Sequence, residues 1–164
     1  MKRFVVMGVS GCGKSHIGQA FAAAIGARFV DGDNLHPQAN IEKMSRGEPL
    51  NDHDRAPWLD KIGAALVAAG TVVACSALKR QYRDQIRAVS GAPVIFLYLR
   101  GTRETLLNRM SSRPGHFMPP QLLDTQLATL EPPADDELYL VANIEHTPAE
   151  IIAIFRAGLK EIAE

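Results

Sequence analysis

The stretch Gly8-Val9-Ser10-Gly11-Cys12-Gly13-Lys14-Ser15 fits the pattern GxxxxGK[ST], and the rest of the chain is best read outward from it. It follows the apolar residues 4–7 and precedes a helical pattern, which is the context that a phosphate-binding loop needs. Glycines let the backbone turn tightly and direct N–H groups at phosphate oxygens, and the N-terminus of the following helix adds partial positive charge. In this reading all of residues 8–15 bind the nucleotide, Lys14 reaches the β- and γ-phosphates, and Ser15 ligates Mg²⁺. The alternative is an ordinary glycine-rich turn.

Length and composition predict one soluble domain over residues 1–164, since no charged run or Gly/Ser-rich linker divides the chain. The 18 basic residues balance the 18 acidic ones, so no overall charge attracts nucleic acid or a membrane surface. The N-terminus lacks the apolar core of a signal peptide, and no apolar run has the length of a membrane span, so we expect a cytoplasmic protein. Cys12 and Cys75 fit no disulfide framework or zinc pattern and are expected to be reduced.

Apolar runs alternate with helical patterns along the whole chain. We expect strands at residues 3–7, 28–30, 71–75, 94–99 and 138–142. Helices are expected at residues 14–25 and 37–46, from a cap at Asp52 or Asp54 to about 70, after residue 79, after a cap at Thr102, at 121–130, and after a Thr147/Glu150 capping box. This alternation predicts an α/β fold, with a five-stranded and mostly parallel sheet covered by helices on both faces.

The predicted strand ends restrict the class of phosphate-loop protein. Motor and transporter ATPases need an apolar strand that ends in Asp to hold Mg²⁺, but the third strand ends at Cys75-Ser76 and the fourth at Arg100. The NKxD motif typical of guanine-specific GTPases is absent from the sequence. Small kinases remain, in which a Mg·ATP cradle faces an acceptor pocket and a basic loop closes over both. Residues 109–120 combine arginines with glycine and prolines, which predicts such a lid.

Several further stretches resemble the gluconokinase family. They match in chain order over about four-fifths of the sequence, and they are GVSGCGKS at residues 8–15, DGDNLHP at 31–37, NIEKM at 40–44, GEPLND at 47–52, DRAPWL at 54–59, CSALKR at 75–80, YRD at 82–84 and HFMP at 116–119. This resemblance implies the phosphorylation of D-gluconate to 6-phosphogluconate by ATP with Mg²⁺, a nucleoside-monophosphate-kinase-like fold with a lid, and a homodimer. Cys12 departs from the family pattern, since many relatives have Ser there, but backbone binding of phosphate does not depend on that side chain.

Two carboxylates follow the second predicted strand, where ligands bind in open α/β sheets. One of Asp31 and Asp33 would hold Mg²⁺ through a water molecule, and the other would accept the proton of the attacking hydroxyl group. Similarity to the shikimate kinase branch favours Asp33 as the base and Asp31 as the outer ligand of the metal. The alternative is a turn in which these side chains cap backbone N–H groups.

Basic residues near the third strand are candidates to bind the carboxylate of a sugar acid. Lys79, Arg80 and Arg83 lie just past that strand, and Arg55 begins the helix that should border the acceptor pocket. The apolar side of the helix after residue 79 carries Tyr82, Ile86 and Val89, which leaves Arg80, Arg83 and Arg87 for another face. The alternative reading is therefore a solvated, basic helix face.

Histidines and the lid arginines complete the candidate site. His36, His53 and His116 are candidates to bind sugar hydroxyl groups, although a structural role is the alternative for each, and their spacing suits no zinc site. Arg109 and Arg113 are four residues apart at a helix end, so they share a face from which they would clamp the transferred phosphoryl group or the nucleotide. Their alternative role is to complement the helix dipole.

Two other functions stay open at this point. One is another small-molecule kinase, acting on shikimate, a nucleoside or a nucleoside monophosphate. The other is a regulatory module that binds ATP without chemistry, against which Asp33, Arg109 and Arg113 argue.

Overall fold

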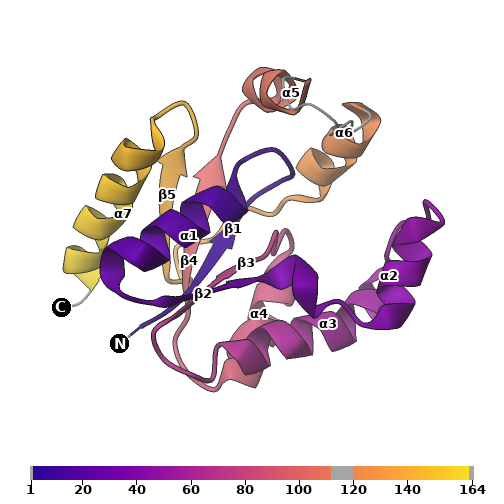
Figure 1. The fold of residues 1–164 in the computed structure, drawn as a ribbon, viewed down its shortest axis with the longest axis horizontal. Coiled ribbons are helices and arrows are strands. Elements are labelled where there is room, and N and C mark those ends of the chain that lie inside the picture. Colours follow the sequence, from indigo (N-terminus) through magenta and orange to yellow (C-terminus); the bar gives the residue numbers. More distant parts are fainter. Residues whose placement is uncertain (1, 112–119, 163–164) are drawn as a thin grey trace.

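The computed structural model describes residues 2–111 and 120–162 (Figure 1). Its sheet consists of the parallel strands β1 (Arg3–Met7), β2 (Arg28–Asp31), β3 (Thr71–Ala74), β4 (Ile95–Arg100) and β5 (Tyr139–Asn143), in the order β2-β3-β1-β4-β5. The predicted α/β fold with a parallel sheet is confirmed, and the strand ends differ from the predicted ones by one residue or less. Because the strands are parallel, their carboxyl ends lie along one edge of the sheet, which is where ligands bind in such folds.

Helices cover both faces of the sheet. They are α1 (Lys14–Ile25), α2 (Gln38–Ser45), α3 (Asp52–Ala65), α4 (Arg80–Ser90), α5 (Arg103–Ser111), α6 (Pro120–Thr129) and α7 (Pro148–Ile162), with a 3₁₀ turn, η1 (Gly32–Leu35). Figure 1 shows α1 and α7 on one face and α3 with α4 on the other. Beyond the carboxyl ends of the strands, α5 and α6 lie side by side and contact one another. Among the described residues, no helix combines the length and the apolar character needed to cross a membrane.

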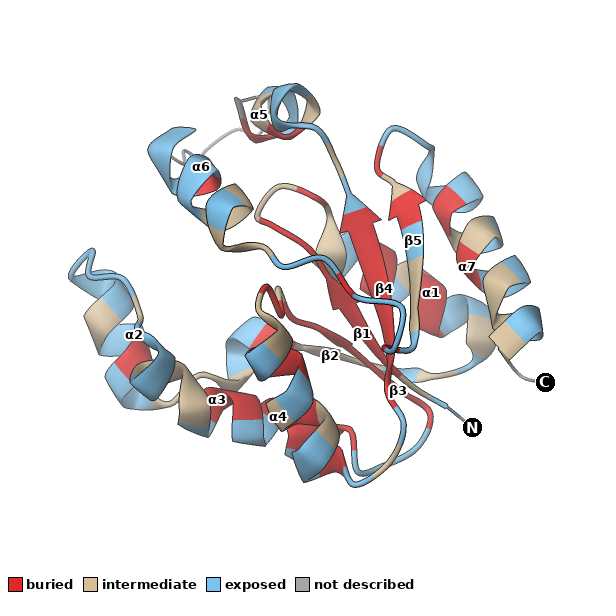
Figure 2. Ribbon diagram, turned by 180° about the vertical axis from the view of Figure 1, so that it is seen from behind, coloured by how far each residue is buried: buried red, intermediate tan, exposed pale blue. Residues whose placement is uncertain are grey.

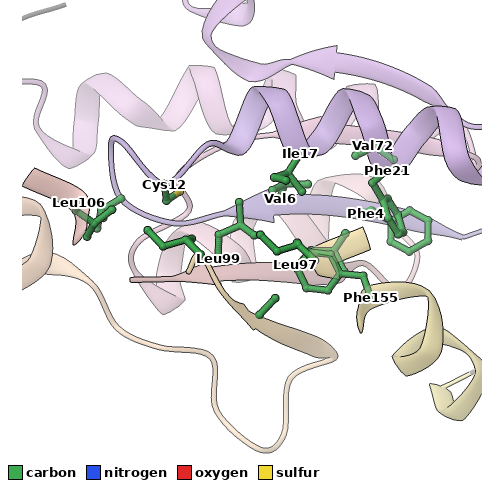
Figure 3. Close-up of a cluster of buried hydrophobic side chains, with 14 of the residues drawn as sticks. Phe4, Val6, Cys12, Ile17, Phe21, Val72, Leu97, Leu99, Leu106 and Phe155 are labelled. Carbon is green, nitrogen blue, oxygen red and sulfur yellow. The ribbon is translucent and has the colours of Figure 1, made fainter. Parts of the chain in front are cut away.

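The apolar run of β1 supplies side chains to two hydrophobic cores. Phe4 and Val6 pack with α1 and α7 in one core, and Val5 and Met7 pack with α3 and α4 in the other. In the first core Phe21 makes edge-to-face contacts with Phe4 and Phe155, at centroid separations of 5.1 and 6.2 Å (Figure 3). Figure 2 shows β1 and β4 as buried strands, as expected for central strands covered on both faces.

Capping explains where two of the helices begin, and one predicted cap is wrong. Neither Asp52 nor Asp54 is the N-cap of α3, because Asn51 has the extended conformation that the cap position requires. Asn51 Oδ1 accepts from Asp54 N at 2.8 Å, and Asp54 Oδ2 accepts from Asn51 N at 3.0 Å. The capping box predicted before α7 is confirmed, since Glu150 N donates to Thr147 Oγ1 and Thr147 N donates to Glu150 Oε1.

Candidate active site

The loop at residues 8–15 joins β1 to α1 and requires glycine at its first position. Gly8 has φ +147°, and a Cβ there would lie 2.7 Å from Cys12 Sγ and 2.9 Å from the Leu99 carbonyl oxygen. At the other end Gly13 caps α1 in the left-handed region, with φ 90°. Lys14 begins the helix, and its Nζ donates to the Val9 carbonyl at 3.3 Å. The loop is therefore compact and leads directly into the N-terminus of a helix, as phosphate-binding loops do. The ammonium group of Lys14 lies against the loop backbone.

Asp31 and Ser15 lie together across β2 and the start of α1. Ser15 Oγ donates to Asp31 Oδ2 at 3.2 Å, and Asp31 Oδ1 accepts from Asp33 N at 3.0 Å. Asp31 thus caps the η1 turn, as the alternative reading of the sequence expected, and also contacts the Ser15 hydroxyl. A hydroxyl and a carboxylate in contact are oxygen ligands that suit Mg²⁺, which also takes waters and nucleotide phosphates as ligands. The described residues contain no group of three or more His, Cys, Asp or Glu that would hold a metal by themselves.

A pocket of about 170 Å³ lies next to the phosphate loop. Its lining comes from the loop and the start of α1, η1, α3, the β3–α4 turn, α4 and α6, and comprises Ser10, Lys14, Asp33, Arg55, Trp58, Ser76, Ala77, Leu78, Tyr82, Gln126 and Thr129. Three predicted site residues, Lys14, Asp33 and Arg55, are therefore brought to one cavity. The side chain of Asp33 accepts no hydrogen bond given by the described residues, so its carboxylate remains available to a ligand there.

Two cations flank one carboxylate at the edge of this pocket. The Tyr82 hydroxyl donates to Asp52 Oδ1 at 2.5 Å and accepts from Arg55 at 3.2 Å, and Lys79 Nζ donates to Asp52 at 3.4 Å. The hydrogen bond from Tyr82 is the largest cause that lowers the pKa of Asp52, so the carboxylate stays ionised at neutral pH. Arg55 and Lys79 also lie 5.5 and 5.6 Å from the centre of the Tyr82 ring. The cluster carries one net positive charge and suits an anionic ligand.

Arg83 does not belong to this pocket, and the expectation of a solvated or substrate-facing arginine is wrong. Its side chain is fully buried, and its Nε donates to Glu137 Oε1 at 2.8 Å. Another guanidinium nitrogen donates to the Ala77 carbonyl at 2.8 Å. Ala77 lines the pocket and has a positive φ of 46°. Among the described residues, it is the only residue other than glycine with a positive φ. Arg83 therefore supports the pocket wall from behind, and the neighbouring Arg80 pairs with Asp136 at 2.9 Å.

Removing the Glu137 carboxylate is expected to lower the free energy of unfolding. Burial raises the pKa of Glu137, but hydrogen bonds from Arg83, Ala134 N and Arg87 outweigh it and lower the pKa to about 2. The folded pKa is below the ordinary value of 4.5, so this stabilisation is complete above pH 4.5 and is lost as pH falls toward 2. Glu137→Gln leaves the fully buried guanidinium group of Arg83 without its carboxylate partner, which costs about 3–5 kcal/mol, whereas Arg87 keeps its ion pair with Asp84.

Urea unfolding between pH 7 and pH 3 measures both effects, with Asp135→Asn as the exposed control in the same segment. We expect Glu137→Gln to lose stability at pH 7 and to depend less on pH than the wild type between pH 4.5 and 3. Equal stability of Glu137→Gln and Asp135→Asn at pH 7 would contradict this role of the ion pair.

The structure describes two of the three candidate histidines and only the ends of the predicted lid. His36 stacks on Trp58, a pocket residue, with ring centroids 4.2 Å apart, and is not itself among the residues that line the pocket. Burial is the main cause that lowers the pKa of His36, so it is neutral at pH 7. His53 is exposed. Arg109, in α5, donates to the Ile144 carbonyl, and Arg113 and His116 lie outside the described residues, as do residues 112–119 of the predicted lid.

Several polar residues of the pocket are not assigned to it by the sequence, among them Tyr82 and Gln126. Tyr82 was assigned only to the apolar side of its helix, although its hydroxyl joins the cluster around Asp52. Gln126 was not singled out, although its amide contacts Ser10 of the phosphate loop. No local pattern distinguishes Gln126 from an ordinary surface residue of a helix, because its partner is 116 positions away.

Comparisons with known proteins agree on one group of enzymes. A family model described as shikimate kinase matches residues 10–145. The thermosensitive gluconokinase of Escherichia coli K12 is 49% identical, over 98% of this chain and 89% of that protein. The gluconokinase of Gluconobacter oxydans 621H is 46% identical, over 93% of this chain and 90% of its own. The crystal structure of a gluconokinase from Sinorhizobium meliloti 1021 is 48% identical and superposes with a TM-score of 0.91, over 99% of this chain and 93% of that one.

Proposed function

This chain belongs to the gluconokinase family of shikimate-kinase-like P-loop kinases, and we propose that its reaction takes place in the pocket between the phosphate loop, Asp33 and Arg55. The protein is a gluconokinase that uses ATP, and the product is 6-phospho-D-gluconate. We place the reaction in this pocket because Lys14, Asp33 and Arg55 all line the same cavity. These residues supply a phosphate-binding cation, a carboxylate for the acceptor hydroxyl and a cation for the acceptor carboxylate.

The nucleotide would lie with its phosphates on residues 8–15. Backbone N–H groups and the start of α1 would bind the β-phosphate, and Lys14 would leave the Val9 carbonyl to reach the β- and γ-phosphates. Ser15 and Asp31 would hold Mg²⁺, Ser15 directly and Asp31 through water, which their contact of 3.2 Å supports. When bound, the metal neutralises charge on the phosphate oxygens during transfer.

The acceptor would lie between Asp33 and the cluster of Arg55, Lys79, Tyr82 and Asp52. Asp33 would orient the terminal hydroxyl of gluconate and accept its proton, and Arg55 with Lys79 would bind the carboxylate. The predicted binding of sugar hydroxyl groups by His36 stays a prediction; its ring stacks on Trp58, which lines the pocket. The predicted roles of Arg109, Arg113 and His116 in clamping the phosphoryl group and the acceptor stay predictions, as does the homodimer.

Release of ADP with different acceptors tests the function. We expect strong stimulation by D-gluconate in the presence of Mg²⁺, and little by shikimate, AMP or water alone. Equal stimulation by shikimate or AMP would indicate another small-molecule kinase. ATP binding with no stimulation by any acceptor would indicate a regulatory module.

Replacing Arg55 by glutamine is expected to weaken binding of gluconate specifically. A charge-assisted hydrogen bond contributes roughly 1.5–3 kcal/mol, so the KM for gluconate should rise about 10- to 100-fold. The KM for ATP and kcat should change little, because this contact is shared by the ground and transition states. Initial rates over a range of gluconate concentrations measure this, with Arg46→Gln as the exposed control. A fall in kcat at unchanged KM would contradict the assignment.

A further inference from the structure

Gln126 holds the phosphate loop at Ser10 through both polar atoms of its side-chain amide. Ser10 N donates to Gln126 Oε1 at 2.7 Å, and Gln126 Nε2 donates to Ser10 Oγ at 3.0 Å. The backbone N–H can only donate, so it determines which end of the amide faces it. A two-point contact of this kind fixes the orientation of Ser10 as well as its position.

The helix that carries Gln126 also makes contacts of its own with the hydrophobic core and with α5. Leu123 is fully buried in the core beneath α6. On the outer side Arg103 of α5 makes two hydrogen bonds to the carboxylate of Asp124, at 2.6 and 3.2 Å. These contacts attach α6 to the core and to α5. Through Gln126, the phosphate loop is therefore connected to a helix that is itself packed against the rest of the fold.

The loop needs such a contact because its own backbone is rich in glycine. Gly8, Gly11 and Gly13 all have positive φ, and glycine restricts the conformations of a chain least. Gly8 N donates to the Ser76 carbonyl at 3.2 Å, which ties the start of the loop to the segment after β3. Gln126 provides the corresponding tie two residues later.

We propose that Gln126 is a positioning residue for phosphoryl transfer, and that it acts through Ser10 to keep the phosphate loop in the conformation that receives ATP. The proposal rests on the proposed function, because it concerns the same pocket: Ser10 and Gln126 line it together with Lys14 and Asp33. Catalysis of phosphoryl transfer depends mainly on position and charge, so a loop displaced by a fraction of an ångström lowers the rate without abolishing binding.

The test replaces Gln126 by methionine, which keeps the length of the side chain and removes both hydrogen-bonding atoms. Losing two neutral hydrogen bonds to the loop should lower kcat about tenfold or more, and the KM for gluconate should change less than threefold. The control is Gln121→Met, an exposed glutamine in the same helix. Thermal unfolding of both variants shows whether a fall in activity comes from lost stability.

Hydrogen exchange of the Ser10 amide provides a second readout that needs no activity. In the wild type this amide should exchange at least about tenfold more slowly than an unprotected amide, and Gln126→Met should remove that protection while Gln121→Met keeps it. The double variant Ser10→Ala/Gln126→Met should lose less activity than the two single effects combined, because both act on one contact.

Three results would overturn the proposal: a kcat of Gln126→Met within twofold of the wild type, a fall in kcat with unchanged Ser10 exchange, or an unprotected Ser10 amide in the wild type. The exchange of the wild-type Ser10 amide can overturn the proposal even where Gln126→Met does not fold. If gluconate does not stimulate ADP release by the wild type, the proposed function is wrong. Hydrogen exchange of the Ser10 amide in the wild type and in Gln126→Met still tests the contact between Gln126 and Ser10 in that case.

Discussion

The variant Lys14→Ala is expected to lower kcat by about 10²- to 10³-fold, which is the range found when one group that stabilises transition-state charge is removed. The transferred phosphoryl group spreads negative charge over its oxygens, and Lys14 is the cation that the loop itself brings to them. The KM for ATP should rise as well, because the ammonium group also contacts the phosphates before transfer. Initial rates over a matrix of ATP and gluconate concentrations separate the two effects.

The matched control for this prediction is Lys61→Ala, an exposed lysine on α3. It should retain activity within twofold, which shows that the loss of one positive charge elsewhere has no effect. Among the described residues, the side chain of Lys14 donates only to the Val9 carbonyl, so its removal should change the thermal midpoint little. Near-normal turnover by Lys14→Ala would mean that residues 8–15 are not the active cradle.

The variant Asp33→Asn is expected to lower kcat by about 10²-fold, within the range typical for loss of a general base. Asparagine keeps the size of the side chain and removes the charge. The Asp33 backbone N–H donates to Asp31 Oδ1, and this bond does not depend on the side chain, so η1 should keep its conformation. The affinity for ATP should change little.

The KM for gluconate distinguishes the possible roles of Asp33. A rise in KM at constant kcat would assign the carboxylate to binding of the acceptor. A fall in kcat of less than tenfold with unchanged KM would remove Asp33 from the catalytic residues and leave the kinase assignment intact, because phosphoryl transfer does not always need a strong base. Glu161→Gln, an exposed carboxylate on α7, is the control.

The sequence predicted which residues of the phosphate loop and of the segment after β2 lie close together, but it did not show which basic residues of α4 are exposed and which are buried. Lys14, Ser15, Asp31 and Asp33 follow strands of one parallel sheet, so the strand pattern alone predicts that they lie at the same edge of the sheet. The basic residues of α4 lie one or two turns into a helix, where each face meets a different neighbour. Arg80 binds the exposed Asp136, whereas Arg83 is buried against Glu137.

By itself, the sequence determined the features that depend on neighbouring residues. Glycine at positions of positive φ marked the phosphate loop, side chains three residues apart marked the capping box of α7, and uninterrupted apolar runs marked strands buried on both faces. Each of these signals lies within a few residues because its physical cause is a local dihedral angle, a local hydrogen bond or the period of one element.

Only the tertiary structure decided which polar side chains face the ligand pocket and which support it. Arg83 is buried because Glu137, 54 positions later, neutralises it, and Gln126 reaches Ser10 across 116 positions. A charged or amide group leaves water only where a partner replaces its hydration, and that partner is brought by the packing of distant elements. The residues next to Arg83 or Gln126 in the sequence do not indicate that partner. The supporting roles of these two side chains could therefore be recognised only from the fold.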